Sequence, residues 1–139
     1  MIVLDTNVLL DLVTDDPMWA PWSARQLEAA SLQGRLVIND VVYAELSIRY
    51  ERIEGLDRLL RDAVLEIEPI PRAALFLAGK AFERYRRRGG ARTGVLPDFF
   101  IGAHAAVANL PLLTRDPRRY RGYYPMVTLL APLDAGTVG

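Results

Sequence analysis

Four acidic side chains occur in otherwise apolar stretches of the chain: Asp5, Glu45, Asp98 and Asp116. A carboxylate in such surroundings is unfavourable to ionise unless a cation or hydrogen-bond donors compensate its charge. Two carboxylates about 4 Å apart repel each other by roughly 4 kcal/mol at an effective dielectric constant near 20. If the four converge, they therefore need a divalent cation, and a set of oxygen ligands favours Mg²⁺ or Mn²⁺ over zinc.

Each of these acids also has an ordinary structural explanation. Asp5 and Asp116 can be turn residues, and Asp98 can cap the helix expected to follow it. Glu45 can form an ion pair with Arg49, one helical turn further along. Glu45 is the hardest of the four to explain in this way, because helix positions that face a core seldom carry an unpaired glutamate.

Strands and helices are expected to alternate along the sequence. Short apolar runs predict strands at 2–4, 36–38, 64–68, 111–114 and 126–130, the third of them an edge strand stopped by proline. Apolar residues at helical spacing predict helices at 8–13, 21–34, 40–48, 52–62, 71–89 and 98–108. The alternation predicts an α/β fold of three layers, with a mostly parallel central sheet of about five strands flanked by helices.

The first strand is the one on which the predicted site depends. It is expected to end at Asp5, with Thr6 or Asn7 capping the helix that follows. This places the Asp5 carboxylate at the carboxyl edge of the sheet, where strands diverge and helix N-termini point into the gap. Ligands of open α/β sheets bind at that edge, so Asp5 is a candidate metal ligand.

The composition limits the class of protein. A chain of 139 residues, half of them hydrophobic, predicts a single globular domain spanning 1–139. We expect no membrane association, because no apolar run approaches about 20 residues and the N-terminus lacks a signal-peptide pattern. The lack of cysteine excludes thiolate metal sites and fits a cytoplasmic location. His104 is the only histidine, which excludes a two-histidine acid–base pair; we expect it to be hydrogen-bonded in or beside the core.

Charge is unevenly distributed although the net charge is zero. Residues 1–83 carry a balance of −6, whereas residues 84–121 hold nine arginines against two aspartates. Arginine is the better bidentate ligand for phosphate. A solvated helix end with scattered surface charge would give the same pattern, so the asymmetry is a hint of an anionic polymer as partner.

The four acids lie in segments that together resemble the PIN domain, and in particular the compact bacterial PIN-domain ribonucleases that act as toxins in VapBC-type toxin–antitoxin pairs. The resemblance spans residue 2 to about residue 130. Its segments are Leu4-Asp5-Thr6-Asn7, Val42-Tyr43-Ala44-Glu45-Leu46, Leu96-Pro97-Asp98-Phe99-Phe100 and Leu113-Thr114-Arg115-Asp116. It implies that Asp5, Glu45, Asp98 and Asp116 are the catalytic acids that bind Mg²⁺ or Mn²⁺, with Thr6, Asn7 and Thr114 as polar neighbours that orient them.

The resemblance also implies the reaction and the partners. The reaction would be metal-assisted hydrolysis of RNA phosphodiester bonds, leaving a 5′-phosphate and a 3′-hydroxyl. The partners would be RNA, a cognate antitoxin whose segment fills a groove near the N-terminal helices, and a second copy in a homodimer. Four arginines near the acids are the candidates for RNA binding: Arg92, Arg115, Arg118 and Arg119.

Two other functions remain open at this stage. A PIN-type nuclease could act in RNA processing, and a non-catalytic module could use the metal site to hold phosphate. A phosphatase of the haloacid-dehalogenase type is disfavoured, because Asn7 stands where that chemistry uses a second aspartate. A receiver domain is disfavoured because the chain lacks the adjacent acid pair before its first helix and a matching downstream lysine.

Overall fold

A computed structural model describes residues 1–133 and contains one parallel five-stranded sheet. The strands are β1 (Ile2–Leu4), β2 (Leu36–Ile38), β3 (Leu65–Ile67), β4 (Leu112–Leu113) and β5 (Leu129–Leu130). Their order in the sheet is β3-β2-β1-β4-β5, and every neighbouring pair is parallel. The predicted α/β fold with a parallel sheet of about five strands is confirmed.

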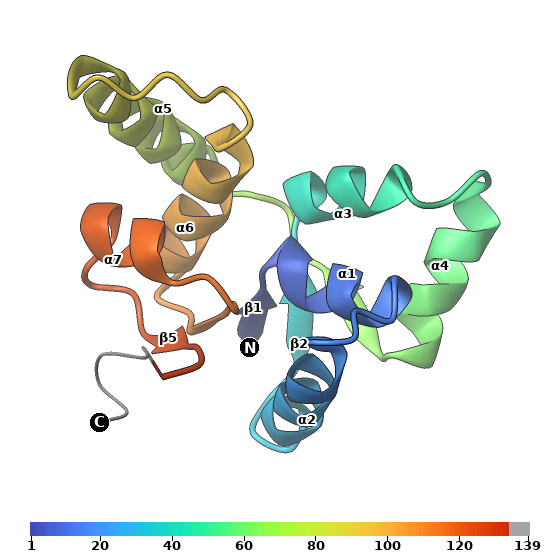
Figure 1. Ribbon diagram of the computed structural model, residues 1–139. Helices are drawn as coiled ribbons and strands as arrows, with labels where there is room; N and C mark the ends of the chain where they lie inside the picture. The colour runs from blue at the N-terminus through green and yellow to red at the C-terminus, as the bar shows by residue number, and fades with distance from the viewer. Residues whose placement is uncertain (134–139) are drawn as a thin grey trace.

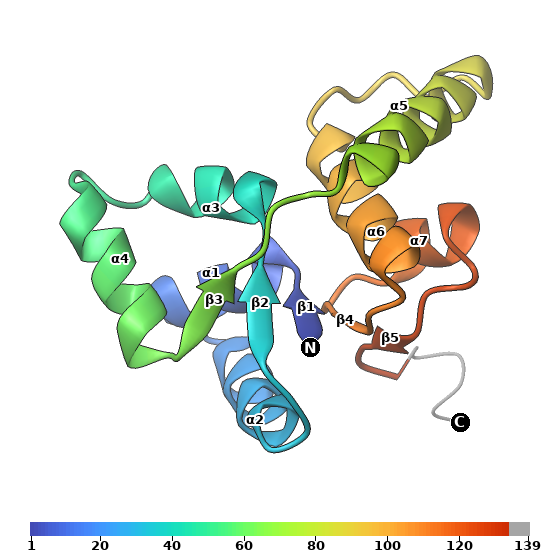
Figure 2. The same ribbon diagram turned by 180° about the vertical axis from the view of Figure 1, so that it is seen from behind.

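The helices form the two outer layers. They are α1 (Thr6–Val13), α2 (Ala20–Ser31), α3 (Asp40–Ser47), α4 (Ile53–Asp62), α5 (Arg72–Arg87), α6 (Leu96–Ala108) and α7 (Arg118–Tyr123). The chain moves outward from β1 to β3 and then returns to β4 on the other side of β1. Because crossovers between parallel strands are right-handed, this reversal puts α1 to α4 on one face and α5 to α7 on the other (Figures 1 and 2).

The reversal creates a switch point between β1 and β4. Connections leave these two strands in opposite directions, and in open α/β sheets the region beyond the carboxyl ends of such strands is where ligands bind. Helices α3 and α6 come from opposite layers and contact each other there. Side chains at or after the ends of β1 and β4, and side chains of α3 and α6, can therefore reach the region beyond the carboxyl ends of the two strands.

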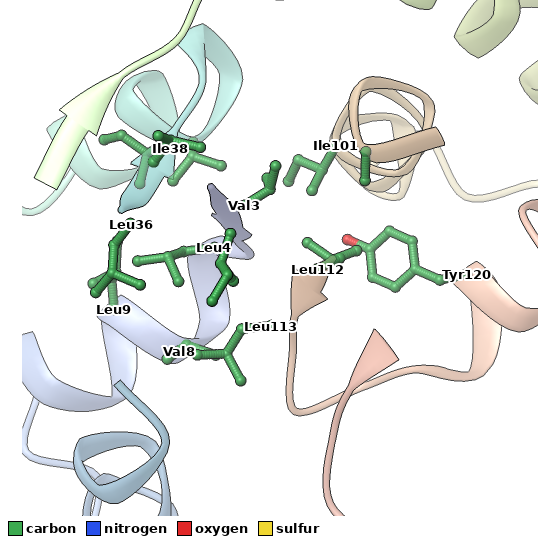
Figure 3. Packing of buried hydrophobic residues seen from close by; sticks show 14 of the residues in the cluster. Val3, Leu4, Val8, Leu9, Leu36, Ile38, Ile101, Leu112, Leu113 and Tyr120 are labelled. Atoms are coloured by element: carbon green, nitrogen blue, oxygen red, sulfur yellow. The ribbon is translucent and has the colours of Figure 1, made fainter. Parts of the chain in front are cut away.

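The strands are held by a core that is continuous across the sheet. Val3 and Leu4 of β1 are fully buried, between α1 residues on one face and Ile101 of α6 on the other (Figure 3). Strand β1 has apolar residues at every position because both of its faces are covered. Each fully buried aliphatic side chain contributes about 1.5–3 kcal/mol relative to exposure, so this centre is a rigid base for the edge above it.

Several predicted boundaries differ in the structure. The prediction that Asp98 caps α6 was wrong: the helix begins at Leu96, after Val95, and Asp98 lies within its first turn. The helix after β1 begins at Thr6, so neither Thr6 nor Asn7 precedes it as a cap. Strand β5 is shorter than the predicted 126–130, and helix α7 was not predicted. Within residues 1–133, no helix is long and apolar enough to cross a membrane.

Candidate active site at the carboxyl edge of the sheet

Asp5 lies immediately after β1 and is buried, with a relative exposure of 4%. Its Oδ2 accepts hydrogen bonds from the hydroxyls of Thr114 and Tyr120, each at 2.8 Å, and from Nδ2 of Asn7 at 3.4 Å. Burial, with the negative charge of Asp98 as the next contributor, raises the pKa of Asp5 from its ordinary 3.8 to about 7. The hydroxyl donors oppose this rise but do not cancel it.

Glu45 reaches the same region from α3. Its Oε1 accepts a hydrogen bond of 2.6 Å from the hydroxyl of Thr6, the first residue of α1. Burial raises the pKa of Glu45, and the charge of Asp98 adds to the rise. Among the described residues no ion pair joins Glu45 to Arg49, so the structure does not support an ion pair as the explanation of this glutamate.

Asp98 approaches from α6 and is held by an arginine of α7. Its Oδ2 is 2.6 Å from Nη1 of Arg119, and both side chains are about one-third exposed or less. Burial raises the pKa of Asp98, Arg119 opposes that rise, and the charge of Asp116 adds to it. Arg119 therefore supplies positive charge inside a group of acids that otherwise repel one another.

Asp116 is the most exposed of the four acids. It lies between β4 and α7, and its Oδ1 is 3.2 Å from Nε of Arg118. Its backbone N–H donates to the Thr114 hydroxyl, which in turn donates to Asp5. The loop after β4 is thus connected by hydrogen bonds to the end of β1, although the Asp116 carboxylate is turned toward Arg118.

The four acids, named here the acidic site, lie at the predicted edge and influence one another electrostatically. In residues 1–133, no three acidic or histidine side chains stand in an arrangement that could hold one metal ion. Two of the carboxylates are paired with arginines instead. The donor set nevertheless suits a hard divalent cation, because all of its ligand atoms are carboxylate oxygens, and burial raises the pKa of Asp5, Glu45 and Asp98.

The family model for the PIN domain matches residues 2–123 of the sequence. The chain belongs to the PIN domain family. A search of curated proteins finds no match. Solved structures do match, and the similarity extends over nearly the whole chain.

Three of these structures illustrate how closely the PIN fold is reproduced. VapBC2 from Rickettsia felis, bound to a DNA fragment from its promoter, is 22% identical with a TM-score of 0.71, covering 96% of this chain and 100% of that one. DNA-bound VapBC from Salmonella typhimurium is 19% identical with a TM-score of 0.66, covering 94% and 96%. VapBC-1 from nontypeable Haemophilus influenzae is 20% identical with a TM-score of 0.66, covering 94% and 98%. At these identities the likeness establishes the fold.

Tyr120 is a site residue that the sequence reasoning missed. It is fully buried in α7 and donates its hydroxyl to Asp5, and burial raises the pKa of that hydroxyl well above its ordinary value, so it remains a donor. Gly102 of α6 makes room for it: a Cβ there would lie 2.4 Å from the ring of Tyr124 and 3.0 Å from that of Tyr120. The available signal was the four-residue spacing of these two tyrosines, which the surrounding arginines obscured.

Arg115 was predicted to bind RNA, and in the structure its side chain is bound to Asp11. Its Nε lies 3.1 and 2.9 Å from the two carboxylate oxygens of Asp11, which is 2% exposed and also accepts from Ser23. Its guanidinium stands over the ring of Trp19, and its backbone N–H donates to Asn7. This residue ties the loop after β4 to α1 and α2.

The prediction for His104 is confirmed. The side chain is 1% exposed, and its Nδ1 lies 3.2 Å from Nδ2 of Asn39. Because Oδ1 of Asn39 accepts from the backbone N–H groups of Val41 and Val42, its Nδ2 must donate, which makes Nδ1 of His104 the acceptor. Burial lowers the pKa of His104, so the ring is a neutral structural link between α6 and the cap of α3.

Proposed function

We propose that this PIN domain is a Mg²⁺- or Mn²⁺-dependent endoribonuclease. The observation that carries the proposal is the electrostatic influence among the acids at the switch point of the sheet: after burial, Asp98 and Glu45 raise the pKa of Asp5, and Asp98 raises the pKa of Glu45. Such an excess of negative charge in a partly buried crevice is stabilised by a divalent cation. The reaction is hydrolysis: water adds to the phosphorus, the bond to the 3′-oxygen breaks, and the products are a 3′-hydroxyl and a 5′-phosphate.

The residues divide into carboxylates that would hold the ion and groups that position them. Asp5, Glu45, Asp98 and Asp116 are the proposed ligands, and a bound ion supplies Lewis acidity, which activates water and stabilises negative charge on the phosphate. Thr6 orients Glu45, and Thr114 with Asn7 orients Asp5. Arg119, which contacts Asp98 at 2.6 Å, would lie beside the ion and could bind the phosphate of the substrate.

Cleavage assays test this proposal. The purified chain is incubated with RNA in Mg²⁺ or Mn²⁺, with and without chelator, beside Asp5→Asn and Glu45→Gln. We expect cleavage only with metal and only by the unsubstituted chain, with 5′-phosphate ends. Cleavage that survives chelation, or a 2′,3′-cyclic phosphate product, contradicts the mechanism. Binding of RNA without cleavage of any substrate favours a phosphate-binding module.

We further propose that the chain acts in the cytoplasm as the toxin of a toxin–antitoxin pair. The solved structures described above are of VapBC proteins, and each match covers 94–96% of this chain. Between α3 and α4 lies a pocket of about 270 Å³ lined by Tyr43, Tyr50 and Leu56, among others, with Ile48 and Ile53 exposed nearby. Such a surface suits an apolar segment of the antitoxin. Separately, we propose that two copies of the chain form a homodimer.

Expression separates the toxin role from a role in RNA processing. Induction of the chain alone should arrest growth, and co-expression with the product of a neighbouring small gene should relieve the arrest and yield a complex on size-exclusion chromatography. The Asp5→Asn variant should form the same complex without arresting growth. Growth unaffected by the active chain would favour a processing nuclease.

A further inference from the structure

A pocket lies near the acidic site, between α5 and α7, two helices that Figure 1 shows on the same side of the sheet. It is a pocket of about 500 Å³ between the C-terminal end of α5, the loop after it, and α7. Its lining combines three arginines, two tyrosines and three glycines: Arg88, Arg118, Arg119, Tyr85, Tyr123, Gly89, Gly90 and Gly122. Among residues 1–133, no acidic side chain lines this pocket.

The aromatic part of the pocket is rigid. Tyr85 and Tyr123 contact each other edge to face, with ring centroids 6.4 Å apart, and each also packs against Phe99 at 5.5 and 5.0 Å. Both tyrosines are half-buried, and Tyr85 also stacks on Phe82 with ring centroids 5.8 Å apart. The backbone at Gly90 lies directly against the Tyr85 ring, where a Cβ would come within 2.5 Å. Rings fixed in this way can stack on a planar ligand with little loss of side-chain entropy.

The cationic part of the pocket leads to the acidic site. Arg88 stands over the Tyr123 ring at 5.7 Å, which places a guanidinium and an aromatic face together. Arg119 lines the pocket and also contacts Asp98 at 2.6 Å. A polynucleotide that places one nucleotide in the pocket therefore has its next phosphate beside Arg119 and the acidic site.

We propose that this pocket is a subsite for one nucleotide of a single-stranded RNA, its base held by the tyrosines and its phosphate by Arg88 and Arg119. This rests on the proposed nuclease function, since it names the form of RNA that the acidic site receives. Arginine beside aromatic rings is the combination that binds unpaired nucleotides, because every base has a face for stacking and every link carries a charge. A base in a duplex is already stacked and paired and cannot enter.

The chain offers matched variants that test the pocket. Gly122 and Gly79 both lie in helices with open space around the position of a Cβ, but only Gly122 lines the pocket. Gly122→Leu should fill the pocket, whereas Gly79→Leu on α5 introduces the same side chain outside it. Arg88→Ala removes a lining cation, and Arg87→Ala removes a cation from the same helix end that is paired with Glu83 instead.

Affinity for a short fluorescent single-stranded RNA is measured by anisotropy on metal-free protein in EDTA, so that binding is read without cleavage. Gly122→Leu and Arg88→Ala should each weaken binding about tenfold, with Gly79→Leu and Arg87→Ala within about twofold of the unsubstituted chain. Affinity for the same sequence as a duplex should not respond to Gly122→Leu. Equal affinities across all four variants would overturn the proposal.

Two further outcomes separate this subsite from the nuclease function. If the chain cleaves RNA but Gly122→Leu and Arg88→Ala bind and cleave normally, the nuclease stands and the subsite is wrong. If no RNA is cleaved but these two variants lose single-strand binding, the subsite stands and the nuclease is wrong. An oligoglutamate peptide of equal charge that displaces the RNA at equal concentration would show a site for an acidic peptide and overturn the proposal.

Discussion

Neutralising Asp5 should stabilise the metal-free protein, and the effect should depend on pH. Burial and neighbouring negative charge raise the pKa of Asp5 to about 7 in the folded chain, against an ordinary 3.8. Between these values the folded state binds a proton that the unfolded state has released, so stability falls as pH rises. The difference between the two pKa values lowers the free energy of unfolding by about 4 kcal/mol in total as the pH rises from below both values to above both. About 3 kcal/mol of this loss occurs between about pH 5 and pH 8.

The measurement is urea denaturation of the chain and of Asp5→Asn in EDTA at about pH 5 and about pH 8. At the higher pH, Asp5→Asn should be more stable than the unsubstituted chain, by up to about 4 kcal/mol, because its amide carries no charge and its carbonyl can still accept from Thr114 and Tyr120. Asp62→Asn, at the exposed end of α4, is the control and should leave the pH dependence unchanged.

Metal provides a second arm of the same experiment. At about pH 8, Mn²⁺ at a hundredfold excess over its dissociation constant should stabilise the unsubstituted chain by about 2.7 kcal/mol. Asp5→Asn should gain much less. A variant that is less stable than the unsubstituted chain at about pH 8 in EDTA would refute the reasoning, because Asp5 would then be a structural residue.

Three other substitutions have definite expected outcomes. Arg115→Ala should destabilise the fold by about 3–5 kcal/mol in urea denaturation, since it leaves the buried charge of Asp11 without its ion pair. Gly102→Ala should lower stability by about 1–3 kcal/mol, because the added methyl collides with the two tyrosine rings packed against α6; unchanged melting would contradict this. Tyr120→Phe should raise the pKa of Asp5 further in the metal-free protein by removing a donor, so the loss of stability with rising pH, measured by urea denaturation in EDTA, should move to higher pH.

The position of the candidate site was predictable because it depends on residues at the ends of strongly patterned elements. The apolar runs before Asp5 and Asp116 marked two strand ends, and the strand–helix alternation required the strands to be parallel. Parallel strands end at one edge, so the two acids had to be near each other. Glu45 stood out because a carboxylate in an apolar helix face needs compensation, which the structure supplies from Thr6.

The pairings inside the site were not predictable, because they depend on packing between elements distant in sequence. Nothing local to Arg115 indicates that it reaches Asp11 in α1, or that Arg119 reaches Asp98 in α6. Helix α7 is only six residues long and rich in arginine, so its apolar periodicity was too weak to detect. The start of α6 was misplaced because Leu96 and Pro97 fit the first turn of a helix as well as a loop.

The hydrogen bond from Tyr120 to Asp5 has a consequence for biosynthesis. The two residues are 115 positions apart, and Thr114, the other hydroxyl donor to Asp5, is 109 positions away. Strand β1 leaves the ribosome before β4, which Thr114 follows directly, and before α7, which contains Tyr120. Contacts of such long range form late in folding. The acidic site is therefore incomplete until β4 and α7 have been synthesised, because a chain that ends before β4 lacks Thr114, Asp116 and Tyr120.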